Sequence, residues 1–308
     1  MTELPIAQDR ICTIQDCIDE GALLFTDANL FFGHGTDNAD DEAFWLVFHT
    51  LGLPWDSPPS VLQESVSSDN YQRIKNVFDR RIKERIPAAY LTGEAWFAGT
   101  AFTVNKDVLV PRSPIAELIQ AHYQPWLQAD KPKILDLCTG SGCIGIASAL
   151  ALPSAQLILS DISSLALAVA NENIQRYSLG GRAHTLESDG LSAFDPNKSE
   201  HQFDLIVSNP PYVDANDFAT MPDEYHAEPE LGLVSGPDGL EFIRNLLGLA
   251  PDYLTQEGIL IVEVGNSWVA LQDAFPTVPF LWIEFERGGH GVFILTREQL
   301  LQYRTFFS

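Results

Sequence analysis

Apolar and polar residues follow a helical period in the first third of the chain. Apolar side chains recur every three or four positions over residues 11–25, 40–51 and 74–82. This spacing predicts three amphipathic helices. Ser68 or Asp69 can cap the third, because short polar side chains accept from the first free backbone N–H groups of a helix. We expect residues 1–92 to form a small helical domain that serves partner recognition.

The pattern changes between residues 93 and 112. Apolar and aromatic positions over 96–104 and 108–110 are separated by the polar segment Asn105–Asp107. Two such runs around a short polar segment predict a β-hairpin. We interpret this hairpin as the linker to a second domain over residues 113–308.

Short apolar runs alternate with helical patterns in that second domain. Alternation of this kind predicts a doubly wound α/β sheet. The final two runs are joined by residues 287–290 and form an expected hairpin, which makes the last strand antiparallel. A long segment, 213–236, shows no evident element. The predicted strands lie at 133–137, 157–161, 183–186, 205–207, 258–264, 280–286 and 291–296.

Composition limits the classes of protein to consider. The 308 residues are 45% hydrophobic and 10% aromatic, enough for a substantial core. No run of about 18 apolar residues occurs, so we expect no membrane span. Residues 1–9 lack a basic segment followed by an apolar one, so we expect no signal peptide and a cytoplasmic protein. The four cysteines have no zinc-type spacing, and we expect reduced thiols without a metal.

The chain is strongly acidic. It carries 18 Lys and Arg residues against 42 Asp and Glu residues, a net charge of −24. The average field of such a protein repels nucleic acid and attracts a basic protein partner. A surface that keeps the protein soluble, or a salt-adapted source, explains the same charge.

A short turn rich in proline follows the fourth predicted strand. Pro210 and Pro211 fix φ and keep the residues before them out of the helical region, so no helix begins there. The turn then presents the Asn209 amide, the Pro210 carbonyl and the Tyr212 ring. Two acceptors and a flat ring suit a conjugated NH₂ group, which is held by its N–H bonds and stacked upon. The alternative is a plain turn at the end of a strand.

A glycine turn follows the first strand of the second domain. Gly140, Gly142 and Gly145 match the spacing of a dinucleotide fingerprint, and Asp161 lies 19 residues after Gly142. This match alone is also compatible with a nicotinamide cofactor. Asp161 at a strand end suits the ribose hydroxyls of either cofactor.

Two further carboxylates favour S-adenosylmethionine. Asp136 lies inside the first strand, four residues before Gly140, where it can reach an ammonium group directly or through water. Asp189 follows the third strand and can accept from an adenine amino group. With Asn209 after the fourth strand, where a methyl acceptor must lie, the combination predicts a methyltransferase.

The Asn209-Pro210-Pro211-Tyr212 turn resembles the signature of methyltransferases that act on planar nitrogen. Residues 85–118 resemble the linker of the protein glutamine N5-methyltransferases (HemK/PrmC-like). Arg112-Ser113-Pro114 is similar to the branch that modifies the third large-subunit ribosomal protein (PrmB), whereas the release-factor branch typically has Arg-Pro-Asp-Thr-Glu. Further similarity to the ribosomal-protein branch lies at residues 33–38, 228–233 and 288–293.

The resemblance implies a seven-stranded Rossmann-like sheet, S-adenosylmethionine as cofactor, S-adenosylhomocysteine as product and no metal. It implies a basic ribosomal protein as substrate, with neither membrane nor direct nucleic-acid binding. The implied catalytic residues are Asn209, Pro210, Pro211 and Tyr212. The implied cofactor-binding residues are Asp136, Cys138, Thr139, Gly140, Gly142, Asp161, Ile162, Asp189 and Asn209. The implied substrate-binding residues are Asn209, Pro210, Tyr212 and Arg112.

Three alternatives remain open at this point. The same reaction on a release factor would use the same turn. A nucleic-acid amino-methyltransferase shares it too, but Arg80, Arg81, Lys83 and Arg85 are mixed with apolar positions and form no basic cluster. A non-catalytic assembly factor would not need an intact cofactor loop. Neither His34 nor the segment 213–236 receives a role.

Overall fold

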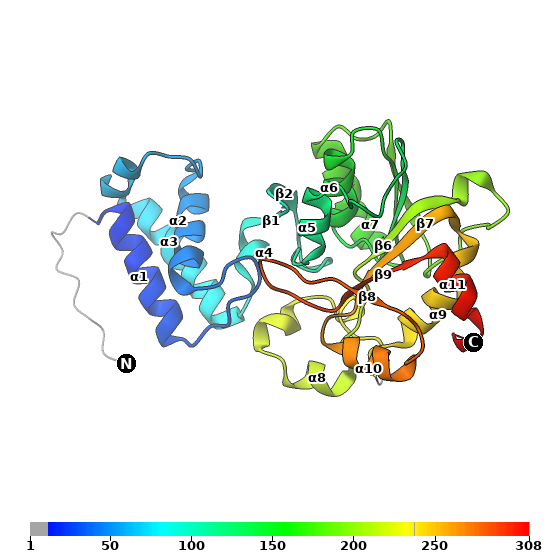
Figure 1. The fold of residues 1–308 in the computed structure, drawn as a ribbon. Helices are drawn as coiled ribbons and strands as arrows, with labels where there is room; N and C mark the ends of the chain where they lie inside the picture. The colour runs from blue at the N-terminus through cyan, green and yellow to red at the C-terminus, as the bar shows by residue number, and fades with distance from the viewer. Residues whose placement is uncertain (1–11, 237, 308) are drawn as a thin grey trace. The chain divides into compact units, whose positions relative to one another are not determined.

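The described part of the chain folds as two compact units. A computed structural model describes residues 12–236 and 238–307 (Figure 1). The helical unit comprises the described residues up to Gly93 together with Pro222–Ala227. The sheet unit comprises Glu94–Met221 and the described residues from Glu228 onwards. The expectations for residues 1–9 and for Ile11 lie outside the described residues.

The helical unit confirms the three expected amphipathic helices and adds a short fourth. They are α1 (Ile14–Asp27), α2 (Ala39–Leu51), α3 (Ser68–Glu84) and α4 (Ala88–Thr92). Thr13 and Asp16 form a capping box at the start of α1. The cap of α3 is Ser67, and not Ser68 or Asp69 as expected, because the Ser67 side chain accepts from the Asn70 N–H. Phe25 and Phe78 pack edge to face with their centroids 5.1 Å apart in the core.

A β-hairpin begins the sheet unit, but its turn differs from the expected one. β1 (Glu94–Phe97) pairs antiparallel with β2 (Thr100–Thr103). Ala98 and Gly99 form the turn with φ of 49° and 79°, the two positive values that a tight two-residue hairpin requires. The expectation that Asn105–Asp107 would turn the chain and that 108–110 would be a strand was therefore wrong.

The sheet has seven strands in the order β5-β4-β3-β6-β7-β9-β8. The five from β5 to β7 are parallel, and β9 is antiparallel to both of its neighbours, which confirms the expected doubly wound sheet and its final hairpin. Apolar runs form these inner strands because both faces are covered. The strands are β3 (Lys133–Leu137), β4 (Gln156–Asp161), β5 (Ala183–Glu187), β6 (Phe203–Ser208), β7 (Leu254–Glu263), β8 (Leu281–Trp282) and β9 (Val292–Thr296).

Each face of the sheet carries its own core. Successive residues of β6 alternate between the two cores, with Leu205 and Val207 in one and Ile206 in the other. The first core includes α5 (Ile115–Gln120), α6 (Cys143–Ala151) and α7 (Ser164–Arg176). The second includes α9 (Glu241–Leu249), α10 (Trp268–Ala274) and α11 (Arg297–Tyr303). Within the described residues, no helix is long and apolar enough to span a membrane.

The segment 213–236 is more ordered than expected. It contains the helix α8 (Ala215–Thr220) and short 3-10 helices at Asp223–Ala227 and Glu230–Gly232. The expectation of no element was wrong, because helices of three to six residues carry too few apolar positions to show a period. We call residues 213–236 the acceptor loop, because they directly follow the turn that presents the Asn209 and Pro210 hydrogen-bond acceptors.

Candidate functional site

The Asn209 turn lies at the carboxyl edge of the sheet, between two neighbouring strands. In the parallel pairing, Ser208 is opposite Leu137 of β3 on one side and Val262 of β7 on the other. Asn209 therefore leaves β6 beside the glycine loop and beside Glu263. This is the edge at which open α/β sheets bind ligands.

The glycine loop is tied to the end of β4. The Gly140 N–H donates to Oδ2 of Asp161 at 2.9 Å, and the Ser163 N–H donates to Oδ1 at 2.9 Å. Burial raises the pKa of Asp161 while these two donors oppose the shift. Gly140 has φ of +54°, and no atom lies within 4 Å of the place where a Cβ would be. The loop thus leaves open space beside a carboxylate whose orientation is fixed.

Asp136 is buried inside β3, and only one of its two carboxyl oxygens accepts hydrogen bonds from residues that the structure describes. Its Oδ2 accepts from the Thr139 hydroxyl at 2.6 Å and from the Gly145 N–H at 2.9 Å. Its Oδ1 is buried with no hydrogen-bond partner among the described residues. Burial raises the pKa of Asp136 to about 7. A buried acceptor without a donor is costly, and an ammonium group or a water held by one would relieve it.

The other predicted cofactor residues surround this loop. Cys138 follows β3 in a left-handed conformation with φ of 56°, and Gly142 caps α6. Ile162 follows Asp161 with half of its side chain exposed. Asp189 is exposed two residues after Glu187, which is opposite Asp161 in the pairing of β4 with β5. The structure brings all of these to one edge, around the ends of β3, β4 and β5.

The turn itself is held through its last residue. The Tyr212 N–H donates to the Leu233 carbonyl at 3.1 Å, and its carbonyl accepts from the Ser267 hydroxyl at 2.8 Å. Asn209 is half-buried, and within the described residues neither its amide nor the Pro210 carbonyl has a hydrogen-bond partner.

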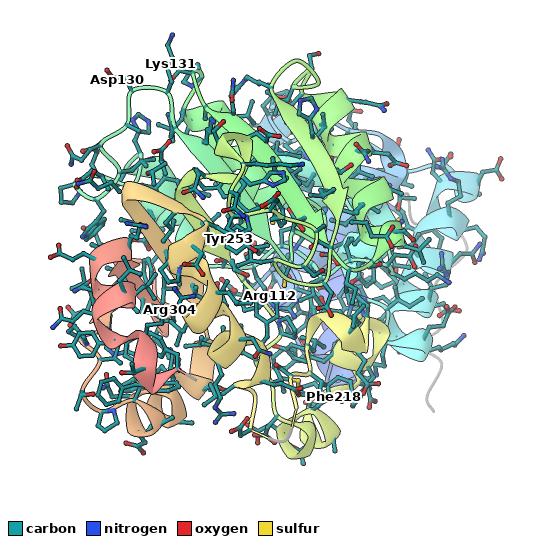
Figure 2. All side chains as sticks on the ribbon, turned by 90° about the vertical axis from the view of Figure 1, so that its right-hand side faces the viewer. Arg112, Asp130, Lys131, Phe218, Tyr253 and Arg304 are labelled. Carbon is teal, nitrogen blue, oxygen red and sulfur yellow. The ribbon has the colours of Figure 1, made fainter. Side chains whose placement is uncertain are left out.

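Arg112 forms an ion pair with Glu228. Its Nη1 and Nη2 lie 2.8 and 2.5 Å from the two oxygens of Glu228, and the Val110 N–H donates to the same carboxylate at 2.8 Å. Figure 2 labels Arg112 in the sheet unit. The pair fixes the Glu228 end of the acceptor loop, a role that the sequence alone did not suggest.

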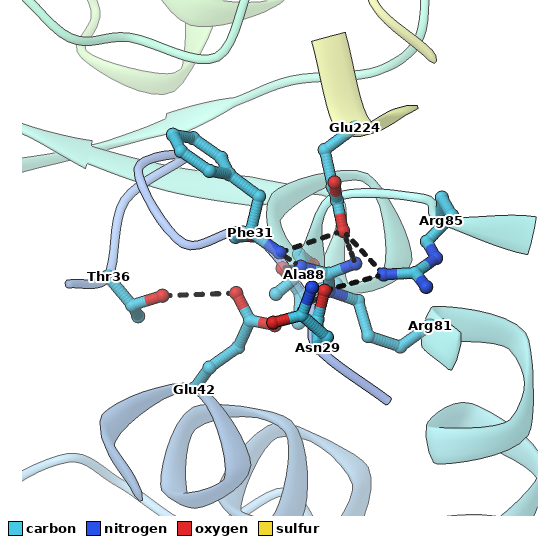
Figure 3. Close-up of polar contacts among 9 residues, drawn as sticks. Asn29, Phe31, Thr36, Glu42, Arg81, Arg85, Ala88 and Glu224 are labelled. Carbon is cyan, nitrogen blue, oxygen red and sulfur yellow. Dashed lines mark hydrogen bonds and ion pairs between the residues drawn. The ribbon is translucent and has the colours of Figure 1, made fainter. Parts of the chain in front are cut away.

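Another part of the acceptor loop belongs to the helical unit. Glu224 is buried there, with Oε1 at 3.0 Å from Arg81 Nη1 and 3.2 Å from the Phe31 nitrogen (Figure 3). Arg81 also donates to Glu42 at 2.6 Å. Burial alone would raise the pKa of Glu224, but Arg81 holds it below its usual value. In the sequence, Arg81 is one of several scattered basic residues, and nothing there indicates this buried cluster.

Glu263 and Ser113 are further residues at this edge that sequence analysis missed. Glu263 ends β7 with 5% of its surface exposed, and it accepts hydrogen bonds from Ser113 and Tyr212. A carboxylate directly after the apolar run 259–262 is a signal that could have indicated it.

No metal site is visible in the part of the chain that the structure describes. No group of three or more His, Cys, Asp or Glu residues there is arranged to hold an ion. None of the four cysteines, all of which lie in the described part of the chain, forms a disulfide.

Comparison with known proteins gives a consistent picture. Residues 120–223 match the family model described as the methyltransferase small domain. The chain is 43% identical over 302 residues to the ribosomal protein uL3 glutamine methyltransferase of Francisella tularensis, covering 97% of this chain and 95% of that protein. It is 44% identical over 297 residues to the protein of the same name from Neisseria gonorrhoeae, covering 96% and 98%.

The chain also resembles a more distant solved structure. The hMettl16 catalytic domain in complex with a MAT2A 3′UTR hairpin aligns with a TM-score of 0.51 at 13% identity, over 75% of this chain and 81% of that one. At this identity the likeness shows a shared methyltransferase fold alone.

Proposed function

Because the chain belongs to the family of ribosomal protein uL3 glutamine methyltransferases, we propose that it methylates the side-chain amide nitrogen of a glutamine in ribosomal protein uL3. The methyl donor in this proposal is S-adenosylmethionine. The observation that carries the proposal is the end of β6 beside the glycine loop of β3. There the Asn209 amide and the Pro210 carbonyl have no hydrogen-bond partner among the described residues.

The residues around β3, β4 and β5 fit the cofactor. The orphaned Oδ1 of Asp136 would accept from its ammonium group, directly or through water. Asp161 would accept from the ribose hydroxyls, Asp189 from the adenine amino group, and Ile162 would lie against the adenine ring. Cys138, Thr139, Gly140 and Gly142 would line the remaining space. When bound, S-adenosylmethionine supplies an electrophilic methyl group, and S-adenosylhomocysteine is released.

The turn would act on the acceptor by placement. A carboxamide nitrogen has a delocalised lone pair and is a poor nucleophile. The Asn209 oxygen and the Pro210 carbonyl would accept from its two N–H bonds, and Tyr212 would stack on its plane. Pro211 keeps this corner rigid. Fixing the nitrogen in line with the methyl group supplies most of the rate.

No strong base is required at this point of the site. The nitrogen becomes acidic as the new C–N bond forms, and its proton can pass to water. The turn holds its acceptors in place before the reaction. They therefore do not have to reorient as charge develops on the nitrogen.

The remaining parts serve the protein substrate in this proposal. The helical domain, residues 1–92, recognises the ribosomal protein, and the hairpin segment 93–112 links it to the methyltransferase domain, 113–308. A charge of −24 would steer a basic ribosomal protein towards the enzyme. We place the reaction in the cytoplasm, with neither membrane nor nucleic acid as a partner and without a metal.

A parallel assay tests the proposal. Tritiated S-adenosylmethionine is incubated with the enzyme and, in separate reactions, with ribosomal protein uL3, a peptide chain release factor and RNA. We expect label in uL3 alone, and the label to map to a glutamine. Label in the release factor or in RNA would assign the enzyme to that substrate instead, and no label in any reaction would contradict the methyltransferase proposal.

A further inference from the structure

Glu263 is a buried carboxylate beside the turn that the mechanism above does not use. It is the last residue of β7, and its neighbour Val262 is opposite Ser208, one residue before Asn209. Its Oε2 accepts from the Ser113 hydroxyl at 2.5 Å, and its Oε1 accepts from the Tyr212 hydroxyl at 3.2 Å. Both donors are neutral hydroxyl groups that come from separate segments of the chain.

Gly265 and Ser267 also contact Tyr212. A Cβ on Gly265 would lie 2.5 Å from the Tyr212 ring, so only glycine allows this close approach. Ser267 donates to the Tyr212 carbonyl at 2.8 Å. The Glu263 contact holds the hydroxyl at the end of the ring and so limits the rotation of the ring.

We propose that Glu263 is a positioning residue, which fixes the Tyr212 ring through its hydroxyl so that the ring stacks on the acceptor carboxamide. Ser113 supports it by holding the second carboxylate oxygen. This inference rests on the proposed function, since it concerns how that site places its substrate. Glu263 itself need not touch the substrate or the cofactor.

The residue type fits this role. A carboxylate can accept from two hydroxyl groups at once, whereas a glutamine offers only one oxygen. Burial raises the pKa of Glu263 to about 7, and the two hydroxyls and the Arg112 charge oppose the shift. An apolar residue of similar volume would fill this place without the cost of burying a charge. A role in packing alone therefore does not explain a carboxylate at residue 263.

A double-mutant cycle tests the proposal. Glu263→Gln, Tyr212→Phe and the double variant are compared for turnover on uL3, for KM of uL3 and for adenosylhomocysteine affinity by calorimetry. Glu257→Gln, exposed on the same strand, is the matched control. We expect Glu263→Gln to lower kcat on the order of tenfold, with the adenosylhomocysteine affinity changed less than about twofold and no further loss in the Tyr212→Phe background.

Effects that multiply in the double variant would overturn the proposal, because Glu263 would then act independently of the Tyr212 hydroxyl. An unchanged kcat would do the same. If Glu263→Gln does not fold, Ser113→Ala replaces it in the cycle with the same expected pattern.

A second measurement does not depend on methyl transfer. Protein labelled with 3-fluorotyrosine gives a ¹⁹F resonance for Tyr212, assigned by its absence in Tyr212→Phe. We expect Glu263→Gln to shift or broaden this resonance and Glu257→Gln to leave it unchanged. An unmoved resonance would overturn the positioning role even if uL3 proved not to be the substrate.

Discussion

The backbone N–H of Gly140 donates to the Asp161 carboxylate across 2.9 Å, so the loop after β3 is tied to the end of β4. The same carboxylate is proposed to hold the ribose of the cofactor. One residue therefore both shapes the loop and contacts the ligand.

Replacing Asp161 should weaken cofactor binding before it affects chemistry. Asp161→Ala removes an acceptor for the ribose and frees the Gly140 loop, so we expect the adenosylhomocysteine Kd to rise roughly 10- to 100-fold. Turnover at saturating cofactor should fall much less. Asp130→Ala, on an exposed loop (Figure 2), is the control. Calorimetry that gave equal affinities for the two variants would exclude the ribose role.

Asp136 should make stability depend on pH. Its folded pKa of about 7 lies above its usual 3.8, so the folded protein binds more protons than the unfolded chain between these values. Stability then falls as pH rises through this window. We expect Asp136→Asn without cofactor to gain about 1–3 kcal/mol relative to wild type between pH 5 and pH 8.

Urea unfolding of both proteins at the two pH values measures this gain. Comparing the variant with wild type cancels the contribution of Glu263, which titrates in the same range. Asp136→Asn should also bind adenosylhomocysteine more weakly, because a neutral amide attracts an ammonium group less strongly than a carboxylate does. A stability difference that is independent of pH would contradict the raised pKa.

Arg81 should be essential to the stability of the helical unit. Arg81→Met leaves Glu42 buried without its ion-pair partner and leaves Glu224 with only Arg85, 3.5 Å away. Removing one partner of a buried pair costs roughly 3–5 kcal/mol. The neighbouring Arg80 is exposed and pairs with Glu84 at 3.6 Å, so Arg80→Met should cost less than about 1 kcal/mol. Urea unfolding followed by circular dichroism measures both, and similar midpoints would disprove the buried cluster.

Gly145 should not tolerate a side chain. A Cβ there would lie 2.9 Å from Oδ2 of Asp136 and would clash with Leu159, which is fully buried. Alanine would favour the helix by about 1 kcal/mol, but overpacking costs about 1–3 kcal/mol, so we expect Gly145→Ala to destabilise. A Cβ at Gly180 would meet no atom within 4 Å. Gly180→Ala should therefore change the free energy of unfolding by less than about 1 kcal/mol. A more stable Gly145→Ala would show that α6 shifts freely.

The sheet was predictable from the sequence because its strands are short apolar runs. The expected bounds of β3, 133–137, agree with the structure, since Lys133 and the Cys138 turn delimit the run. The expected strand at 280–286 was too long, because only Leu281–Trp282 pairs with β9. Apolar composition continues beyond the point where a partner strand is available, and composition alone does not mark that point.

The site was predictable where residues close in sequence act together. Asn209 to Tyr212 and Gly140 to Gly145 are local motifs whose geometry follows from proline and glycine. Contacts between distant segments were not predictable, such as Ser113 with Glu263 or Arg81 with Glu224. These pairs lie over 100 residues apart, and one sequence gives no signal that joins them.

In the proposed mechanism, the Asn209 turn holds the glutamine carboxamide for methyl transfer. Turnover of Asn209→Ala on ribosomal protein uL3, measured beside its adenosylhomocysteine affinity, tests it most directly. We expect turnover to fall about 1,000-fold or more while the affinity changes only a few-fold. Turnover within about twofold of wild type would show that Asn209 does not hold the acceptor.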